Sequence, residues 1–408
     1  MATKNNLFSK ARFTFVGTIT YNKKDNAPVS DNPLKEGSKW NRKRLNIGVM
    51  DEAKNVGYLT MDYIYDPKNP TVKLFDAENK QHEVKIKDLA LPSNIALVPD
   101  FSRIIIDLEE DMEVKKEYTK DIYALRNLVD KEEKTEEDLA KIEEHKKNIA
   151  EKATKRFECG HIDTAINIIN EHLPELDKKK VRITGQVNVN YYNGKSRLEY
   201  VPSRIEIARP EEKSELTIDA KLFFMDGCVN DDEENKRATI VAYLGQRYKK
   251  ADKIFPVSLI LDYSKLDLEY SLHAQMLDFL MKSFEVEDEE NVMNMRFQLK
   301  VINSREEKEF NEDCLTDQQK TMIALGMATI DDFKPRGNVF GDRIQEIRVI
   351  KPLLIDDYAN GALIGFPLEN LANYIVNEKD DESDIKQEDV KKEETDPVNQ
   401  DLFGGLFG

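Results

Sequence analysis

Basic and aromatic side chains gather near the N-terminus in a combination suited to binding single-stranded nucleic acid. Cations follow the phosphate backbone, and aromatic faces stack on unpaired bases at about 1–3 kcal/mol per base. The cations lie in or beside a loop between two expected strands, with the only tryptophan of the chain among them. The residues predicted to take part are Arg12, Tyr21, Lys23, Lys24, Lys39, Trp40, Arg42, Lys43 and Arg44.

Two further sets of the same composition occur later. The first surrounds Asn193-Gly194, a strong signal for a type I′ hairpin turn, and consists of Arg182, Tyr191, Tyr192, Lys195 and Arg197. We expect it to flank one groove together with the N-terminal set. The second is thinner and consists of Lys221, Phe223, Arg237, Tyr243, Arg247 and Tyr248. For each single residue, ordinary packing or a solvated cation is an open alternative.

For binding to nucleic acid, the distribution of charge along the chain matters more than the net charge. The formal net charge is -17, which opposes phosphate binding because that binding depends on Lys and Arg. However, residues 10–65 hold 10 Lys/Arg against 6 Asp/Glu, and residues 178–209 hold 8 against 2. Residues 378–401 hold 11 acids against 4 Lys. Basic surface is therefore concentrated in a few segments of an acidic protein.

Hydrophobic periodicity predicts strands interrupted by helices. Period-two alternation predicts strands over 12–21, 41–50, 58–65, 181–191 and 197–207, and helical spacing predicts an insertion at about 107–175. A weak repeat of this order follows from 216, with an acidic loop at 230–235 in place of the basic one. Its expected elements are strands over 216–225, 236–243 and 254–261, a helix over 266–284, and strands over 295–302 and 340–350.

Each half thus reads strand, strand, strand, helix, strand, strand. That is the layout of the OB-fold, a small Greek-key barrel that binds oligonucleotides and oligosaccharides. The predicted fold class is mainly β with helical insertions: two tandem OB-fold-like five-stranded barrels and a disordered acidic C-terminal tail. The expected domains are a barrel with its insertion over 1–210, a second barrel with a C-terminal packing segment over 211–377, and the tail over 378–408.

The expected tail has too few apolar residues to offset its chain entropy, except at its tip. Solubility does not require Leu402, Phe403, Leu406 and Phe407 there. The tip is predicted to insert into a pocket of a partner protein, while the acids compete with nucleic acid for basic surface.

Motifs of catalysis do not occur in the sequence. We find no phosphate-binding glycine loop, no G-x-S-x-G, no H-E-x-x-H and no dinucleotide fingerprint, so the protein is not expected to be an enzyme or to hold a cofactor. Cys159, Cys228 and Cys314 are too far apart for a zinc site and are interpreted as reduced thiols. The acidic run 107–111 is interpreted as a solvated helix start and not as a metal site.

In this architecture the chain resembles single-stranded DNA-binding proteins of bacteria and bacteriophages, which join an OB-fold to an acidic tail with a hydrophobic end. The resemblance implies sequence-independent coating of unwound DNA in replication, recombination and repair, with enzymes of those processes recruited by the tail. The chain differs from the single-barrel bacterial members of this family in its expected tandem barrels. Its tip also reads Phe407-Gly408 where theirs has a terminal phenylalanine.

We expect a cytoplasmic location, because the sequence has no apolar run of about 18 residues and residues 1–10 lack the apolar run of a secretory signal. If the protein is phage-encoded, this would be the cytoplasm of the bacterial host. The alternative function is that of a phage structural or adaptor protein whose barrels bind protein.

Overall fold

The computed structural model describes residues 10–21, 28–129, 131, 133–192, 194–248, 251–286, 291–308, 315–334, 339–353, 366–367 and 374–376. The predicted site residues Lys23 and Lys24, Asn193 of the hairpin turn, Cys314, and the whole expected tail with Leu402, Phe403, Leu406 and Phe407 lie outside these ranges. No helix within the ranges is long and apolar enough to cross a membrane.

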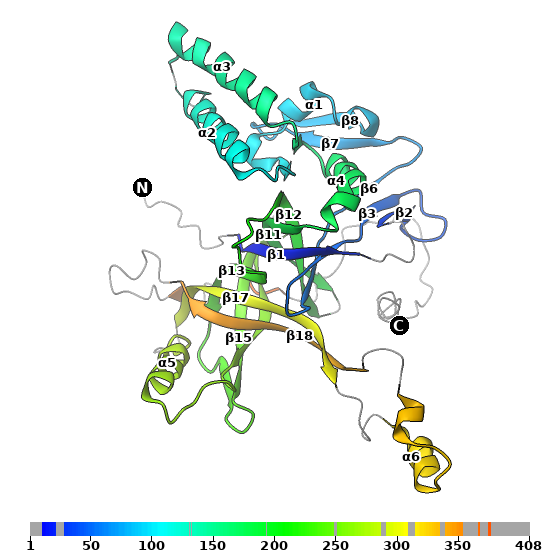
Figure 1. Ribbon diagram of the computed structural model, residues 1–408. Coiled ribbons are helices and arrows are strands. Elements are labelled where there is room, and N and C mark those ends of the chain that lie inside the picture. The colour runs from blue at the N-terminus through cyan, green and yellow to red at the C-terminus, as the bar shows by residue number, and fades with distance from the viewer. Residues whose placement is uncertain are drawn as a thin grey trace.

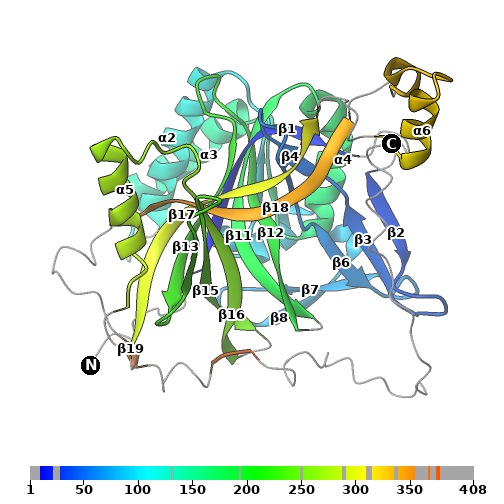
Figure 2. The same cartoon turned by 90° about the horizontal axis from the view of Figure 1, so that it is seen from below.

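One 14-stranded sheet runs through both halves of the chain (Figures 1 and 2). Its first-half strands are β1 (Arg12–Thr20), β4 (Gly48–Met50), β5 (Val56–Tyr58), β9 (Ile104–Asp107), β10 (Arg156–Cys159), β11 (Lys180–Tyr192) and β12 (Lys195–Ile207). Its second-half strands are β13 (Glu215–Phe224), β14 (Val229–Asp232), β15 (Arg237–Tyr248), β16 (Ala251–Asp262), β17 (Asn291–Lys308), β18 (Val339–Pro352) and β19 (Phe366–Pro367). The prediction of a mainly β chain with inserted helices is confirmed.

The strand pairings of the second half form a cycle that begins and ends at β13. β13 pairs with β15, β15 with β16, β16 with β18, β18 with β17, and β17 with β13. Every contact on this path is antiparallel except that of β16 with β18, which is parallel at Ile260 and Arg348. Helix α5 (Ser271–Lys282) connects β16 to β17.

The first half has the same order with shorter strands. β1 pairs with β11 and β4, β11 with β12, and β4 with β5. Just after β5, Leu59 forms a parallel bridge to Tyr200 of β12, and the Thr60 amide donates to the Tyr200 carbonyl at 2.8 Å. Helix α4 (Ile162–Leu176) precedes β11. A separate sheet of β2 (Val29–Pro33), β3 (Asn41–Leu45) and β6 (Asp62–Tyr65) extends the strands beside β4 and β5.

The two halves join along β1 and β13. Arg12 to Val16 pair antiparallel with Asp219 to Glu215, and buried side chains from both halves form one core, including Phe13, Phe15, Leu216 and Phe297. β1 then leaves β13 and pairs with β4 from Thr18 onward. Gly17 stands at this change of partner, where an added Cβ would lie 2.2 Å from the Met50 carbonyl oxygen, so only glycine permits the close approach.

The insertion in the first half is larger than predicted, because it begins well before residue 107 and contains strands. A hairpin of β7 (Thr71–Phe75) and β8 (Gln81–Lys85) has its own small core with Val72, Leu74 and Leu89. It is followed by η1 (Ile86–Asp88), α1 (Pro92–Leu97), η2 (Asp100–Ser102), β9, the paired helices α2 (Met112–Val129) and α3 (Glu136–Lys152), and β10 (Figure 1). The second half also contains α6 (Asp317–Ala324) and η4 (Ile330–Phe333), which were not predicted.

Several predicted elements need correction. The strand predicted over 41–50 is divided between β3 and β4, and that over 58–65 between β5 and β6. The helix predicted from 266 begins at Ser271. The expected acidic loop 230–235 is in part β14, paired with β15 around a turn in which Lys236 has a φ of 51°.

The acidic run 107–111 does not begin as a solvated helix start. Asp107 is 1% exposed, and its carboxylate accepts from the Tyr118 hydroxyl, which lies 2.7 and 2.9 Å from the two carboxylate oxygens. Burial and this contact raise the pKa of Tyr118. A buried carboxylate must find donors. One is the Tyr118 hydroxyl of α2, eleven residues later in the chain, and another is the Glu109 amide at 3.3 Å.

Candidate nucleic-acid interface

An open cationic surface is formed by β3 and the loop before it. We call its residues Lys39, Trp40, Arg42 and Arg44 the arginine face. Alternation along β3 places Arg42 and Arg44 on the same side, where both pair with Asp62 of β6, at 3.2 and 2.9 Å. Their side chains remain 45% and 41% exposed. Trp40 is 41% exposed, and the Lys39 ammonium lies 5.0 Å from its ring centroid. Two guanidinium groups share one carboxylate, so the face carries excess positive charge.

Lys43 belongs to the opposite side of the same sheet. Its ammonium donates to Asp163 at 2.5 Å and to Asn167 at 2.8 Å, both on α4, and its side chain is only 17% exposed. The Tyr63 hydroxyl donates to the same carboxylate at 2.7 Å. Lys43 therefore ties α4 to β3, and the prediction that it lies with Arg42 and Arg44 needs correction.

A second open cationic surface forms where two hairpins meet. The side-chain amide of Gln246 on β15 accepts from the Val189 amide at 2.7 Å and donates to the Val189 carbonyl at 2.5 Å. Beneath these bonds, rings of Tyr191, Phe255 and Tyr248 are in contact, with centroids 6.2 and 5.3 Å apart. Exposed at this joint are Tyr192, Lys195, Arg197 and Arg247, which we call the hairpin bridge. Sequence analysis had assigned them to separate halves; the structure brings them together. Asp252, also exposed, stands opposite Arg247 on β16, so three cations of the bridge face one acid.

Several predicted aromatic residues do not offer a free ring face. Tyr191 is 9% exposed and Phe223 is 0% exposed, which conflicts with a stacking role for either. Tyr21, Tyr243 and Tyr248 are half-buried against the cores. Alternation alone assigns a side to each residue, but it does not say whether that side is covered by the other half of the chain.

The remaining predicted cations of β1, β11 and β13 lie elsewhere. Arg182 is ten residues before Tyr192 along β11, which at about 3.3 Å per residue separates them by about 30 Å. Its guanidinium lies 3.8 Å from Glu212. Arg12 is exposed and stands opposite Asp219, and Lys221 is half-buried opposite Arg296 of β17. Arg12 and Arg182 have acids beside them, and Lys221 is half-buried, so none of the three is assigned to either open surface.

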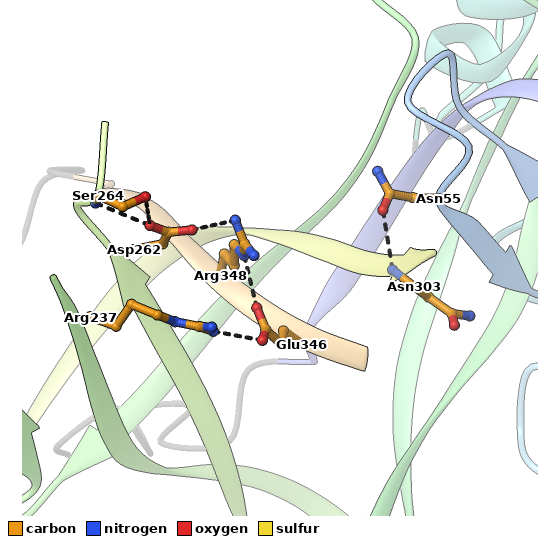
Figure 3. Close-up of polar contacts among 7 residues, drawn as sticks. All are labelled: Asn55, Arg237, Asp262, Ser264, Asn303, Glu346 and Arg348. Carbon is orange, nitrogen blue, oxygen red and sulfur yellow. Dashed lines mark hydrogen bonds and ion pairs between the residues drawn. The ribbon is translucent and has the colours of Figure 1, made fainter. Parts of the chain in front are cut away.

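Arg237, the second-half counterpart of the β3 arginines, is neutralised. Its guanidinium donates to Glu346 at 2.6 Å, and Arg348 donates to Glu346 at 2.9 Å and to Asp262 at 2.5 Å (Figure 3). Burial would raise the pKa of Glu346, but hydrogen bonds from the two arginines outweigh it and lower that pKa. Two cations and two anions cancel, so this network closes the seam between β16 and β18 and leaves no excess charge.

Neither a metal cluster nor a reactive thiol is apparent in the part of the chain that the structure describes. No group of three or more His, Cys, Asp or Glu side chains in that part is arranged to hold a metal ion. Cys159 and Cys228 are buried free thiols, and burial raises the pKa of Cys159 to about 12 and that of Cys228 to about 11. Both thiols therefore stay protonated and unreactive near neutral pH.

Residues that sequence analysis missed line a hollow on the Lys43 side of the small sheet. The lining includes Tyr63 and Tyr65 of β6, Lys85 at the end of β8, and Ile86 and Lys87 of η1. Alternation in Tyr63-Ile64-Tyr65 and in residues 81–87 was the available signal, but only the fold brings the two segments together.

Comparisons with known proteins give little. No family model matches the chain, and no curated protein matches it. Among solved structures, one similar chain is a deletion mutant of the single-stranded DNA-binding protein from Thermus aquaticus, with 9% identity over 72% of this chain and 87% of that one and a TM-score of 0.27. A TM-score this low does not establish a common fold.

Proposed function

We propose that the protein binds single-stranded DNA without sequence preference, through the arginine face and the hairpin bridge. The observation that carries the proposal is the pair of exposed guanidinium groups on β3, which share a single carboxylate beside an exposed tryptophan. Cations beside an aromatic face are what an unpaired strand requires.

We further propose that each half is an OB-fold. Support comes from the strand order, in which the first strand pairs with the second and the fourth and the third pairs in parallel with the fifth. In an OB-fold the ligand binds on strands two and three and on the loops between strands one and two and between strands four and five. On this assignment β3 and β4 form the second strand of the first barrel, and β11 and β12 form its fourth and fifth.

The mechanism that follows is stoichiometric. Phosphates displace counterions from Arg42, Arg44 and the hairpin bridge, and bases stack on Trp40 and Tyr192. Coating prevents the strand from pairing again, as needed in replication, recombination or repair, and no bond is made or broken. The hairpin bridge would carry a bound strand from the first half to the second, because it contains cations of both.

We also propose two roles for the acidic tail, and both are based on its sequence alone. Eleven acids in residues 378–401 would compete with DNA for the arginine face, and Leu402, Phe403, Leu406 and Phe407 would dock into a replication or recombination protein.

The test is fluorescence anisotropy of labelled oligo(dT), titrated with the full chain and with a version ending at Asn377, across a salt series. We expect tight binding that weakens as salt rises and that strengthens when the tail is removed. If neither version binds at low salt, the DNA proposal fails and the adaptor alternative takes its place.

A further inference from the structure

We propose that the hollow between the small sheet and the β7–β8 hairpin is a separate subsite for one nucleotide of the bound strand. This inference rests on the proposed function and adds a contact that neither the arginine face nor the hairpin bridge provides. The hollow has a volume of about 570 Å³, which is ample for a base with its sugar and phosphate.

The floor of the hollow suits a base. Tyr63, Tyr65, Pro70 and Ile86 line it with largely apolar surface, and the two tyrosine rings lie with centroids 5.5 Å apart at an interplanar angle of 31°. Both rings are held by their hydroxyl groups, because Tyr63 donates to Asp163 at 2.7 Å and Tyr65 donates to Asp31 at 2.6 Å. A ring fixed at its hydroxyl loses little freedom when a base stacks on it.

The rim of the hollow suits a phosphate. Lys85 and Lys87 line it and are exposed, and neither forms an ion pair with any residue that the structure describes. The acid on the rim, Asp31, already accepts hydrogen bonds from Tyr65 and from the Asn41 side chain at 3.1 Å. Lys43 is paired with Asp163, and the neutral donors to Asp31 do not cancel its charge. Lys85 and Lys87 still outnumber Asp31, so the rim keeps a net positive charge beside an aromatic floor. This combination recognises a base and its phosphate together.

The hollow lies on the opposite side of the small sheet from the arginine face. Alternation along β3 directs Lys43 into the hollow and Arg42 and Arg44 away from it. A strand must therefore turn around the edge of this sheet to reach both. A short strand is expected to occupy the arginine face alone, and a longer one is expected to reach the hollow as well.

The experiment compares oligo(dT) of about 8 and about 30 nucleotides, lengths chosen from the site sizes of OB-folds. The variant is Lys85→Glu/Lys87→Glu, and the matched control is Lys73→Glu/Lys80→Glu, which reverses two exposed lysines of the same hairpin outside the hollow. We expect the hollow variant to bind the long strand at least about tenfold more weakly, and to reduce its salt slope by about 1.4 for two lost phosphate contacts. Binding of the short strand should change less than about twofold, as should both lengths with the control.

A second measurement locates the contact directly. A long strand carrying 5-iododeoxyuridine, irradiated in complex with the wild-type chain, should crosslink to the peptide that contains Tyr63 and Tyr65, and the hollow variant should lose this crosslink.

The outcomes separate the two proposals. If the wild-type chain binds no DNA, both fall. If it binds but the hollow variant matches its control at both lengths and no crosslink forms at the tyrosines, only the subsite falls. Equal losses at both lengths would mean that the hollow is not separate from the arginine face. A hollow variant that binds DNA normally but no longer responds to removal of residues 378–408 would identify an acidic peptide as the occupant.

Discussion

The β3 arginines and Arg237 start corresponding strands of the two halves, yet their electrostatic environments are opposite. Arg42 and Arg44 share Asp62 and keep a net positive charge, whereas Arg237 and Arg348 are balanced by Glu346 and Asp262 (Figure 3). The first arrangement leaves guanidinium groups available to a ligand, and the second uses them to hold a sheet closed. An arginine on a strand is therefore a candidate for binding phosphate only where the neighbouring carboxylates are fewer than the guanidinium groups.

The largest effect is expected from removing the charge of the arginine face. Arg42→Gln/Arg44→Gln should weaken binding of oligo(dT) by about 10- to 100-fold at low salt, because two phosphate contacts are lost while glutamine can still hydrogen-bond to Asp62. Anisotropy titrations measure the change. Lys116→Gln/Lys147→Gln, which removes two cations of α2 and α3 that are 61% and 76% exposed, should change affinity less than about twofold; equal losses in both variants would refute a localised interface.

The helices of the two halves should respond differently to acid. His161 is the N-cap of α4, where its Nδ1 accepts from the Asp163 amide at 3.1 Å, whereas α5 has no side-chain cap. Burial lowers the pKa of His161 to about 4, against an opposing effect of Asp163. The unfolded chain therefore takes up the proton first as pH falls.

The free energy of unfolding should drop by about 2 kcal/mol between pH 6.5 and pH 5 from this residue alone. Chemical denaturation followed by Trp40 fluorescence measures the loss in the first half. His161→Asn keeps a good N-cap residue without the titration, so its stability should change less over the same interval; identical pH profiles for the two proteins would contradict the assignment.

Removing the two acids that neutralise Arg237 and Arg348 should give the second half an excess positive charge like that of the arginine face. Glu346→Gln/Asp262→Asn should lower the free energy of unfolding by about 1–2 kcal/mol, a modest cost because the pairs are partly exposed. It should also tighten oligo(dT) binding by about three- to tenfold through two newly uncompensated arginines. The control Glu143→Gln/Glu151→Gln on α3 removes the same charge elsewhere, and a matching gain there would indicate a general charge effect.

The smallest effect is expected at Asp62. Asp62→Asn should tighten oligo(dT) binding by about threefold, because Arg42 and Arg44 lose their shared carboxylate. Anisotropy at two salt concentrations measures the gain, which should shrink at high salt. No gain at low salt would mean that these arginines do not contact phosphate.

Sequence patterns predicted the long strands well because period-two alternation is a local property. The segments 12–21, 181–191 and 216–225 match β1, β11 and β13 closely. The β7–β8 hairpin was missed because its strands have only five residues each and offer only Val72, Leu74 and Val84 as buried apolar positions. The arrangement of the candidate interface could not be predicted, because the residues that decide it are distant in sequence: Glu346 lies 109 residues from Arg237, and Asp163 lies 120 residues from Lys43.

The fluorescence of Trp40 offers the most direct test of the central claim. Trp40 is the only tryptophan of the chain and lies, 41% exposed, on the arginine face, so a base that stacks on it must alter its emission. Titration with unlabelled oligo(dT) should quench this fluorescence to saturation at the same concentrations that raise the anisotropy of a labelled strand, and added salt should reverse both signals. Binding seen by anisotropy with unchanged Trp40 emission would contradict the claim that the arginine face holds the DNA.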